Sequence, residues 1–169
     1  MITIISGTNR PGSNTGRIAA QYRDILRSKG IEPNFVSLEG LDVSRRNQQI
    51  IDLENTVLIP SDKFIFIAPE YNGSIPGVLK SLLDNTDIRK VWWGKKALLT
   101  GVSTGRAGNL RGMEHLTGIL HYLRMHVHHN KLPISQVDKF LGNNNTITDP
   151  DTIRVINEQI DEFLRYQTH

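Results

Sequence analysis

Residues 64–80 read FIFIAPEYNGSIPGVLK, and this stretch is the strongest indication of the fold in the sequence. Residues 64–68 form a continuous apolar run, which is typical of a parallel strand buried on both faces. Pro69 removes a ladder donor, and the Asn72-Gly73 pair favours a turn with positive φ. Pro76 suits the first turn of a helix. The stretch therefore predicts a strand, a polar turn and a helix, which is how an open α/β sheet forms a ligand-binding edge.

A second transition of this kind lies at the N-terminus. Residues 2–5 are apolar, and residues 6–16 read SGTNRPGSNTG before a helical pattern begins at Arg17. A helix N-terminus with neighbouring hydroxyls and the guanidinium of Arg10 suits an anionic phosphate group. The loop contains neither G-x-x-x-x-G-K-[ST] nor G-x-G-x-x-G, so we expect neither an ATPase loop nor an NAD-type Rossmann loop.

Strand and helix patterns alternate along the chain. Strands are predicted at residues 2–6, 33–38, 63–68, 96–102 and 125–129. Helices are predicted at residues 14–29, 47–55, 76–85, 109–124 and 150–166. The alternation predicts a doubly wound α/β fold, with a five-stranded parallel sheet and helices on both faces. It fits the flavodoxin-like strand order 2-1-3-4-5, in which ligands bind beyond the carboxyl ends of the first, third and fourth strands.

Length and composition set further limits. At 169 residues the chain fits one compact domain, and we expect residues 1–169 to form it. The absence of cysteine excludes disulfides, a thiol nucleophile and cysteine-ligated metal sites. Because a strand pattern begins at Met1-Ile2, we expect no signal peptide, and no apolar run of the sequence is long enough to span a membrane. We therefore expect a cytoplasmic protein with no membrane partner.

The net charge of +3 does not indicate a nucleic-acid-binding protein. The 20 basic residues are scattered and are nearly matched by 17 acidic ones, without a basic stripe and interleaved aromatic residues. We expect no nucleic-acid partner. A mild positive excess is more simply explained by small anionic ligands.

Three loop segments together resemble the signatures of the NADPH-dependent FMN reductase family. They read GTNRPGSNT at residues 7–15, PEYNGSIPGVLK at 69–80 and STGRAGN at 103–109. The likeness extends over most of the chain, and the second segment is the most specific. It implies a flavodoxin-like flavoprotein with FMN as cofactor and NADPH or NADH as co-substrate. It also implies a homodimer or homotetramer, with residues 76–84 and Trp92-Trp93 as a contact surface.

The resemblance also implies particular contacts with the cofactor. For the FMN phosphate the residues are Arg10, Ser13, Asn14 and Thr15. For the isoalloxazine and ribityl they are Pro69, Glu70, Tyr71 and Asn72. For the far side of the flavin they are Ser103, Thr104 and Gly105. Thr8, where the family usually has serine, keeps the hydroxyl and counts among the cofactor-binding residues.

Several positions leave alternatives open. Arg106 is a candidate for the 2′-phosphate of NADPH or a solvated loop arginine. Glu70 could instead form an ion pair across a dimer interface. Trp92-Trp93 could be a stacking platform for a substrate, or a core or dimer anchor. The family often has glycine at Asn109 and different residues at Ser81 and Asp84-Asn85. The edge of the flavin or substrate pocket could therefore differ from that of the family.

The histidines and serines raise two other possibilities, a metal site and a serine hydrolase, and the sequence argues against both. His126 and His128 would share one strand face, yet no nearby carboxylate or cysteine completes a metal site, so we expect no metal. No G-x-S-x-G elbow is present, which argues against a serine hydrolase.

The resemblance implies an NAD(P)H oxidoreductase that passes hydride to FMN and then electrons to a second acceptor, in ping-pong order. The acceptor would be a small molecule: a quinone, an azo compound, a metal oxyanion or free flavin. No catalytic side chain is expected, because the cofactor carries the chemistry. The alternative is an FMN-binding electron carrier or regulatory flavoprotein that serves a protein partner.

Overall fold

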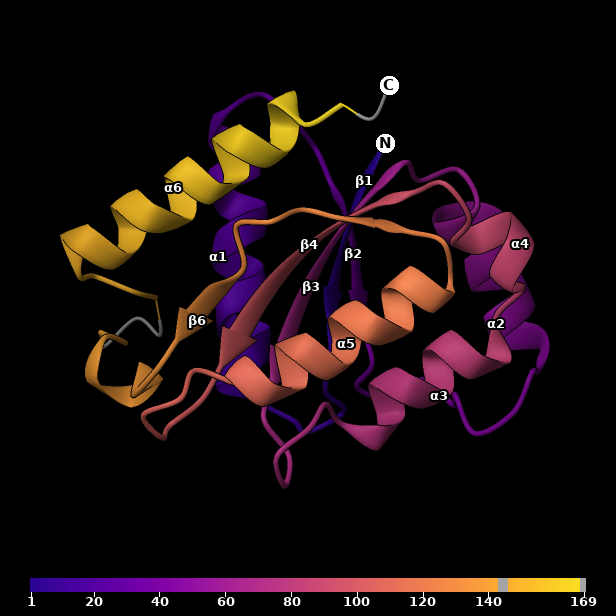
Figure 1. Ribbon diagram of the computed structural model, residues 1–169, viewed down its shortest axis with the longest axis horizontal. Helices are drawn as coiled ribbons and strands as arrows, with labels where there is room; N and C mark the ends of the chain where they lie inside the picture. Colours follow the sequence, from indigo (N-terminus) through magenta and orange to yellow (C-terminus); the bar gives the residue numbers. More distant parts are fainter. Residues whose placement is uncertain (143–145, 168–169) are drawn as a thin grey trace.

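The apolar runs of the sequence form a parallel sheet at the centre of the molecule (Figure 1). The structure is a computed structural model that describes residues 1–142 and 146–167. The strands lie in the order β2-β1-β3-β4-β5, as the sequence predicted. Their bounds are β1 Ile2–Ser6, β2 Asn34–Ser37, β3 Lys63–Pro69, β4 Lys96–Val102 and β5 His126–Val127. In β3 the residues from Phe64 to Ala68 are all buried, which explains their uninterrupted apolar character.

The fifth position of the sheet differs from the prediction of one strand over residues 125–129. It holds two short strands, β5 and β6 (Leu132–Ile134). The first pairs with the start of β4 and the second with its end, from Thr100 to Val102. Pro133 cannot donate a hydrogen bond to the ladder, so the sequence pattern did not predict a strand there. An edge strand such as β6 nevertheless tolerates proline.

Helices cover both faces of the sheet (Figure 1). The predicted helices are present as α1 Asn14–Ser28, α2 Gln48–Leu53, α3 Gly77–Asn85, α5 Leu110–Tyr122 and α6 Pro150–Arg165. The second helix continues as a π-helical turn, η1 (Glu54–Leu58). The short helix α4 (Ile88–Val91) and the 3-10 turn η2 (Val137–Lys139) were not predicted. Four residues and three residues are too few for a periodic signal.

The alternating faces of the strands create two hydrophobic cores. Ile4, Ile65 and Leu98 point to the side covered by α1 and α6. Phe64 and Phe66 point to the other side, covered by α2 to α5. This arrangement leaves the loops after β1, β3 and β4 together at one edge of the sheet, the lower edge in Figure 1.

Within the described part of the chain, no helix has the length and apolar character needed to cross a membrane.

Candidate functional site

The loops that follow β1, β3 and β4 line one cavity of about 500 Å³. Eleven of the thirteen predicted ligand-binding residues line it: Arg10, Ser13, Asn14, Thr15, Pro69, Glu70, Tyr71, Ser103, Thr104, Gly105 and Arg106. The two others, Thr8 and Asn72, do not. The wall also contains Val102, Ala107 and Val137, which carried no sequence signal because apolar side chains occur everywhere.

The first loop presents cations, hydroxyls and a helix N-terminus to this cavity. Ser13 is the N-cap of α1, and its hydroxyl accepts a hydrogen bond from the Gly16 amide at 3.1 Å. Arg10 has no carboxylate partner among the residues that the structure describes. An unpaired guanidinium beside the positive end of a fifteen-residue helix fits an anionic phosphate.

Asn14 is held on both sides of its amide. Its Nδ2 donates to the Asp138 carboxylate at 2.6 Å, and its Oδ1 accepts from the Arg17 guanidinium at 2.8 Å. Asp138 belongs to η2, so the segment after β6 fixes a residue of the first loop. Sequence reasoning missed Asp138, because 124 residues separate it from Asn14.

The second loop is a two-residue hairpin that is fastened at both ends. Tyr71 and Ser74 exchange backbone hydrogen bonds of 2.9 and 3.1 Å around Asn72 and Gly73, which have φ of 51° and 80°. The Tyr71 hydroxyl is hydrogen-bonded to the Thr8 hydroxyl at 2.6 Å. Asn72 lies at the exposed tip of the hairpin, which is why it does not line the cavity.

The guanidinium of Arg10 makes a cation-π contact with the aromatic ring of Tyr71, 4.2 Å from the ring centroid. This contact and the bond to Thr8 join the first loop to the second. Thr8 is buried and supports Tyr71 from behind.

The third loop is braced by its own serine and by β6. The Ser103 hydroxyl donates to the Gly105 carbonyl at 2.9 Å and accepts from the Gly108 amide at 3.0 Å. The Ser103 amide donates to the Ile134 carbonyl. Arg106 is exposed at the mouth of the cavity.

The positions at which the chain departs from the resembling family lie outside the cavity. Asn109 is fully buried, and its Nδ2 donates to the carbonyl of Ala68 at 2.8 Å. Asn85 donates to the Val43 carbonyl, and Asp84 pairs with Lys80 on α3. These residues have structural partners of their own, so they do not disturb the cavity wall.

The two tryptophans do not line the cavity either. Trp92 is fully buried against Phe64, at a centroid distance of 5.0 Å, and its indole N–H donates to Thr86. This burial makes Trp92 a core residue and rules it out as a stacking platform or a dimer contact. The guanidiniums of Arg89 and Arg124 lie 5.2 and 4.1 Å from the ring centroid of Trp93.

The prediction that no carboxylate lies near the clustered histidines was wrong. Potential ligand atoms of His128, His129 and Glu162 lie within 4.8 Å of one another. Helix α6 brings Glu162 there, which the sequence spacing could not indicate. Burial lowers the pKa of His128, as do the nearby charges of His129 and Lys63. The ammonium of Lys63 also opposes a bound cation.

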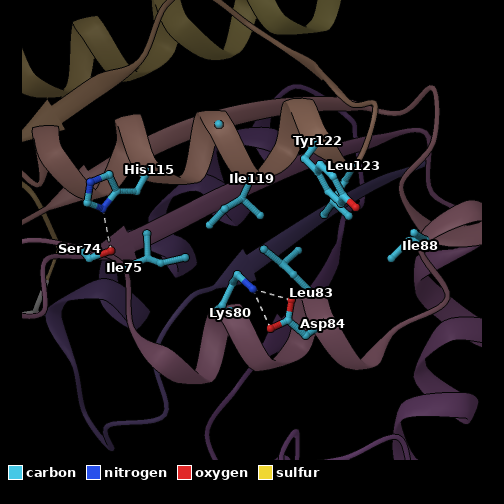
Figure 2. A pocket seen from close by; sticks show the side chains of 11 residues that line it. Ser74, Ile75, Lys80, Leu83, Asp84, Ile88, His115, Ile119, Tyr122 and Leu123 are labelled. Carbon is cyan, nitrogen blue, oxygen red and sulfur yellow. Dashed lines mark hydrogen bonds and ion pairs between the residues drawn. The ribbon is translucent and has the colours of Figure 1, made fainter.

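A groove of about 790 Å³ between α3 and α5 begins beside the hairpin. Figure 2 shows Lys80, Leu83 and Asp84 facing Ile119, Tyr122 and Leu123 across it. At the end nearest the hairpin, Ser74 is hydrogen-bonded to Nδ1 of His115 at 2.9 Å. Tyr122 is 83% exposed, so the groove ends in a large uncovered aromatic ring.

Comparisons with known proteins agree with this architecture. A family model described as NADPH-dependent FMN reductase matches residues 1–139. A 2-hydroxy-1,4-benzoquinone reductase of Burkholderia sp. is 31% identical, over 98% of this chain and 94% of its own length. An NAD(P)H-dependent FMN reductase of Pseudomonas aeruginosa is 30% identical, over 72% of this chain and 70% of its own.

A solved structure has a closely similar backbone. It is a flavoenzyme NAD(P)H:(acceptor) oxidoreductase from Paracoccus denitrificans, with a TM-score of 0.81 and 20% identity. The alignment covers 96% of this chain and 94% of that one. At this identity the likeness concerns the fold, which is flavodoxin-like.

Proposed function

The chain belongs to the NADPH-dependent FMN reductase family, and on that premise we propose that it holds FMN between the three loops and oxidises NAD(P)H. The observation that carries the proposal is the cavity of about 500 Å³ that these loops enclose. Its lining residues match the chemistry of FMN: a guanidinium and hydroxyls suit the phosphate, and a proline, a tyrosine and peptide groups suit the flavin.

The first loop would hold the phosphate. Arg10 supplies a fork-shaped charge, and Ser13, Asn14 and Thr15 supply polar groups at the N-terminus of α1. The bonds of Asn14 to Asp138 and Arg17 hold the amide in one orientation before a ligand arrives. Such preorganisation reduces the entropy that binding must overcome.

The hairpin and the third loop would hold the flavin. Pro69, Glu70 and Tyr71 would frame the isoalloxazine and ribityl from one side, and residues 103–105 would close the other, while Asn72 shapes the hairpin without lining the cavity. Thr8 would act through the Tyr71 hydroxyl rather than by direct contact. Arg106, exposed at the mouth, would receive the 2′-phosphate of NADPH.

Bound FMN would supply hydride and electron transfer, first from NAD(P)H and then to the acceptor, at one shared face. The side chains of this chain bind and orient, and the cavity admits the two substrates in turn, which is ping-pong order. The quinone reductase among the relatives supports a quinone as acceptor.

The experiment is an absorbance spectrum after FMN addition and desalting, followed by anaerobic NADPH. Retained flavin that bleaches rapidly is the expected result, and reoxidation by benzoquinone identifies the acceptor class. Retained flavin that NADPH does not bleach would favour the electron carrier. Absence of retained flavin would overturn the cofactor assignment.

A matched pair of arginine variants tests the phosphate loop. Arg10→Ala should weaken FMN binding at least tenfold, because charge-assisted hydrogen bonds to phosphate contribute about 1.5–3 kcal/mol. Arg111→Ala removes the same charge at an exposed position outside the cavity and should leave FMN affinity unchanged. Equal affinities for the two variants would contradict the phosphate role.

We also propose that two copies pair through the groove between α3 and α5. His115, Gly118, Ile119 and Tyr122 recur at helical spacing along one face of α5. A side chain added at Gly118 would meet nothing within 4 Å, so a neighbouring helix has room to approach. The homodimer, or a tetramer built from it, would cover the apolar wall beside the flavin site.

A further inference from the structure

A third cavity, of about 350 Å³, lies on the other side of the first loop, between β1, α1 and the end of β2. Arg10 and Ser13 line both this cavity and the one assigned to FMN, so the two share a wall. Gly12 lies on the rim, and a Cβ there would meet nothing within 4 Å. A ligand that extends past the phosphate loop can therefore pass over this wall.

The new cavity is rich in guanidiniums. Arg10, Arg17 and Arg23 all line it. Neither Arg10 nor Arg17 has a carboxylate partner in residues 1–142 and 146–167, and Arg17 uses one N–H group on Asn14. Among the described residues, the carboxylate that pairs with Arg23 is that of its exposed neighbour Asp24, at 3.1 Å. Donors therefore remain for a second phosphate.

The outer end of this cavity has groups suited to a nucleoside. Phe35 of β2 is 36% exposed, and the Arg23 guanidinium lies 5.4 Å from its ring centroid, so a flat base has a ring and a cation to stack on. Glu39 follows the end of β2 and is exposed. An ionised carboxylate can accept hydrogen bonds from ribose hydroxyls.

We propose that this cavity binds the adenosine diphosphate group of a dinucleotide, with a phosphate on Arg17, the base on Phe35 and Arg23, and the ribose on Glu39. FAD carries this group to a flavin site, whereas the 2′-phosphate on the adenosine ribose of NADPH is assigned to Arg106, which lines the FMN cavity and not this one. The inference rests on the proposed function, because the shared wall at Arg10 gives the group its connection to the flavin cavity.

The test is a set of titrations followed by flavin fluorescence and calorimetry, with FMN, FAD and ADP as probes. The wild-type protein should bind FAD at least as tightly as FMN, and ADP alone should bind. Arg23→Gln and Phe35→Ser should each weaken ADP binding about tenfold, the effect of losing one charge-assisted or stacking contact. FMN affinity should stay within about twofold, because neither residue lines the FMN cavity.

Arg27→Gln is the matched control, since Arg27 lies on the same helix outside the cavity and pairs with Glu32. It should change none of the affinities. A second comparison tests the assignment to FAD. Arg23→Gln and Phe35→Ser should weaken FAD binding and leave the KM for NADH and NADPH of the FMN-loaded protein unchanged, whereas a tenfold rise in that KM with unchanged FAD binding would overturn the assignment.

The proposal is overturned if ADP does not bind, or if both cavity variants bind ADP and FAD as well as the Arg27→Gln control does. Failure of FMN binding is a separate result that concerns the flavin site alone. ADP titration remains a direct test of the third cavity in that case.

Discussion

At the residue scale, Asn109 combines features that normally exclude one another. It is fully buried, it has a left-handed backbone with φ of 64°, and its Oδ1 is the one buried side-chain polar atom without a partner among the residues described. Its Nδ2 compensates by donating to the Ala68 carbonyl at the end of β3. Asparagine tolerates left-handed backbone better than most residues, which allows this tie between two loops of the site.

Two substitutions at this position separate backbone strain from the hydrogen bond. Both Asn109→Gly and Asn109→Ala lose the bond to Ala68 and should lower the free energy of unfolding by about 1–3 kcal/mol. The free energy of unfolding of the alanine variant should be about 1 kcal/mol lower than that of the glycine variant, because only glycine adopts positive φ without strain. Urea denaturation measures both. An alanine variant as stable as the glycine variant would contradict the strain argument.

His128 illustrates a second residue-level effect, a stability that depends on pH. Its lowered pKa means that the folded protein keeps the imidazole neutral where the unfolded chain, with a histidine pKa near 6.5, already binds a proton. The unfolded state then binds more protons, so the free energy of unfolding falls as pH drops below about 6.5. The fall ends once pH is below the folded pKa.

Replacing this histidine should remove that part of the pH dependence. His128→Phe keeps an aromatic ring against Phe163 and Tyr166 but cannot bind a proton. The wild-type protein should lose more stability than the variant between pH 7.5 and 5, in urea unfolding at each pH. Parallel curves for the two proteins would disprove the assignment.

At the scale of elements, the hairpin of residues 71–74 connects the first loop of the site to helix α5. Tyr71 reaches the first loop through Thr8, and Ser74 reaches α5 through His115. The hairpin can be this short because Asn72 and Gly73 both adopt positive φ.

A pair of glycine variants tests the hairpin. Gly73→Ala should destabilise the protein by about 1 kcal/mol and weaken FMN retention, since alanine is strained at a φ of 80°. Gly77→Ala, four residues later in the first turn of α3, has open space and should be neutral or slightly stabilising. Thermal unfolding and FMN titration provide the comparison, and equal effects of both variants would rule out the backbone explanation.

At the scale of the whole molecule, the proposed flavin site and the groove between α3 and α5 meet at one edge of the sheet. The loops of the proposed flavin site gather at the carboxyl ends of the strands. The groove between α3 and α5 begins at this edge and runs along the outer surface of the helices. Dimerisation through the groove would therefore bring two flavin sites close to one interface.

Assembly can be tested without altering the proposed flavin site. Tyr122→Glu places a charge in the groove and should convert a dimer into a monomer, as measured by light scattering after size-exclusion chromatography. His121→Glu adds a carboxylate one residue away, at an exposed position outside the groove, and should leave the dimer intact. A monomeric wild-type protein, or a dimeric Tyr122→Glu variant, would contradict the proposed interface.

Sequence patterns were sufficient to predict the sheet order, the helices on both faces and the three loops of the site. These features follow from local patterns: buried runs such as residues 64–68, and turn residues such as Asn72-Gly73, act through near neighbours in the chain. Eleven of thirteen predicted ligand-binding residues meet in one cavity for this reason, since parallel strands place their following loops at one edge.

Other features of the molecule depend on contacts between segments that are far apart in the chain, and they became visible in the three-dimensional structure. The bond from Asn14 to Asp138, the approach of Glu162 to His128 and the burial of Trp92 all join residues that sequence spacing does not relate. The split of the last strand into β5 and β6 depends on an edge position that tolerates Pro133. These features come from packing between distant segments, and a local sequence pattern carries no information about the energy of that packing.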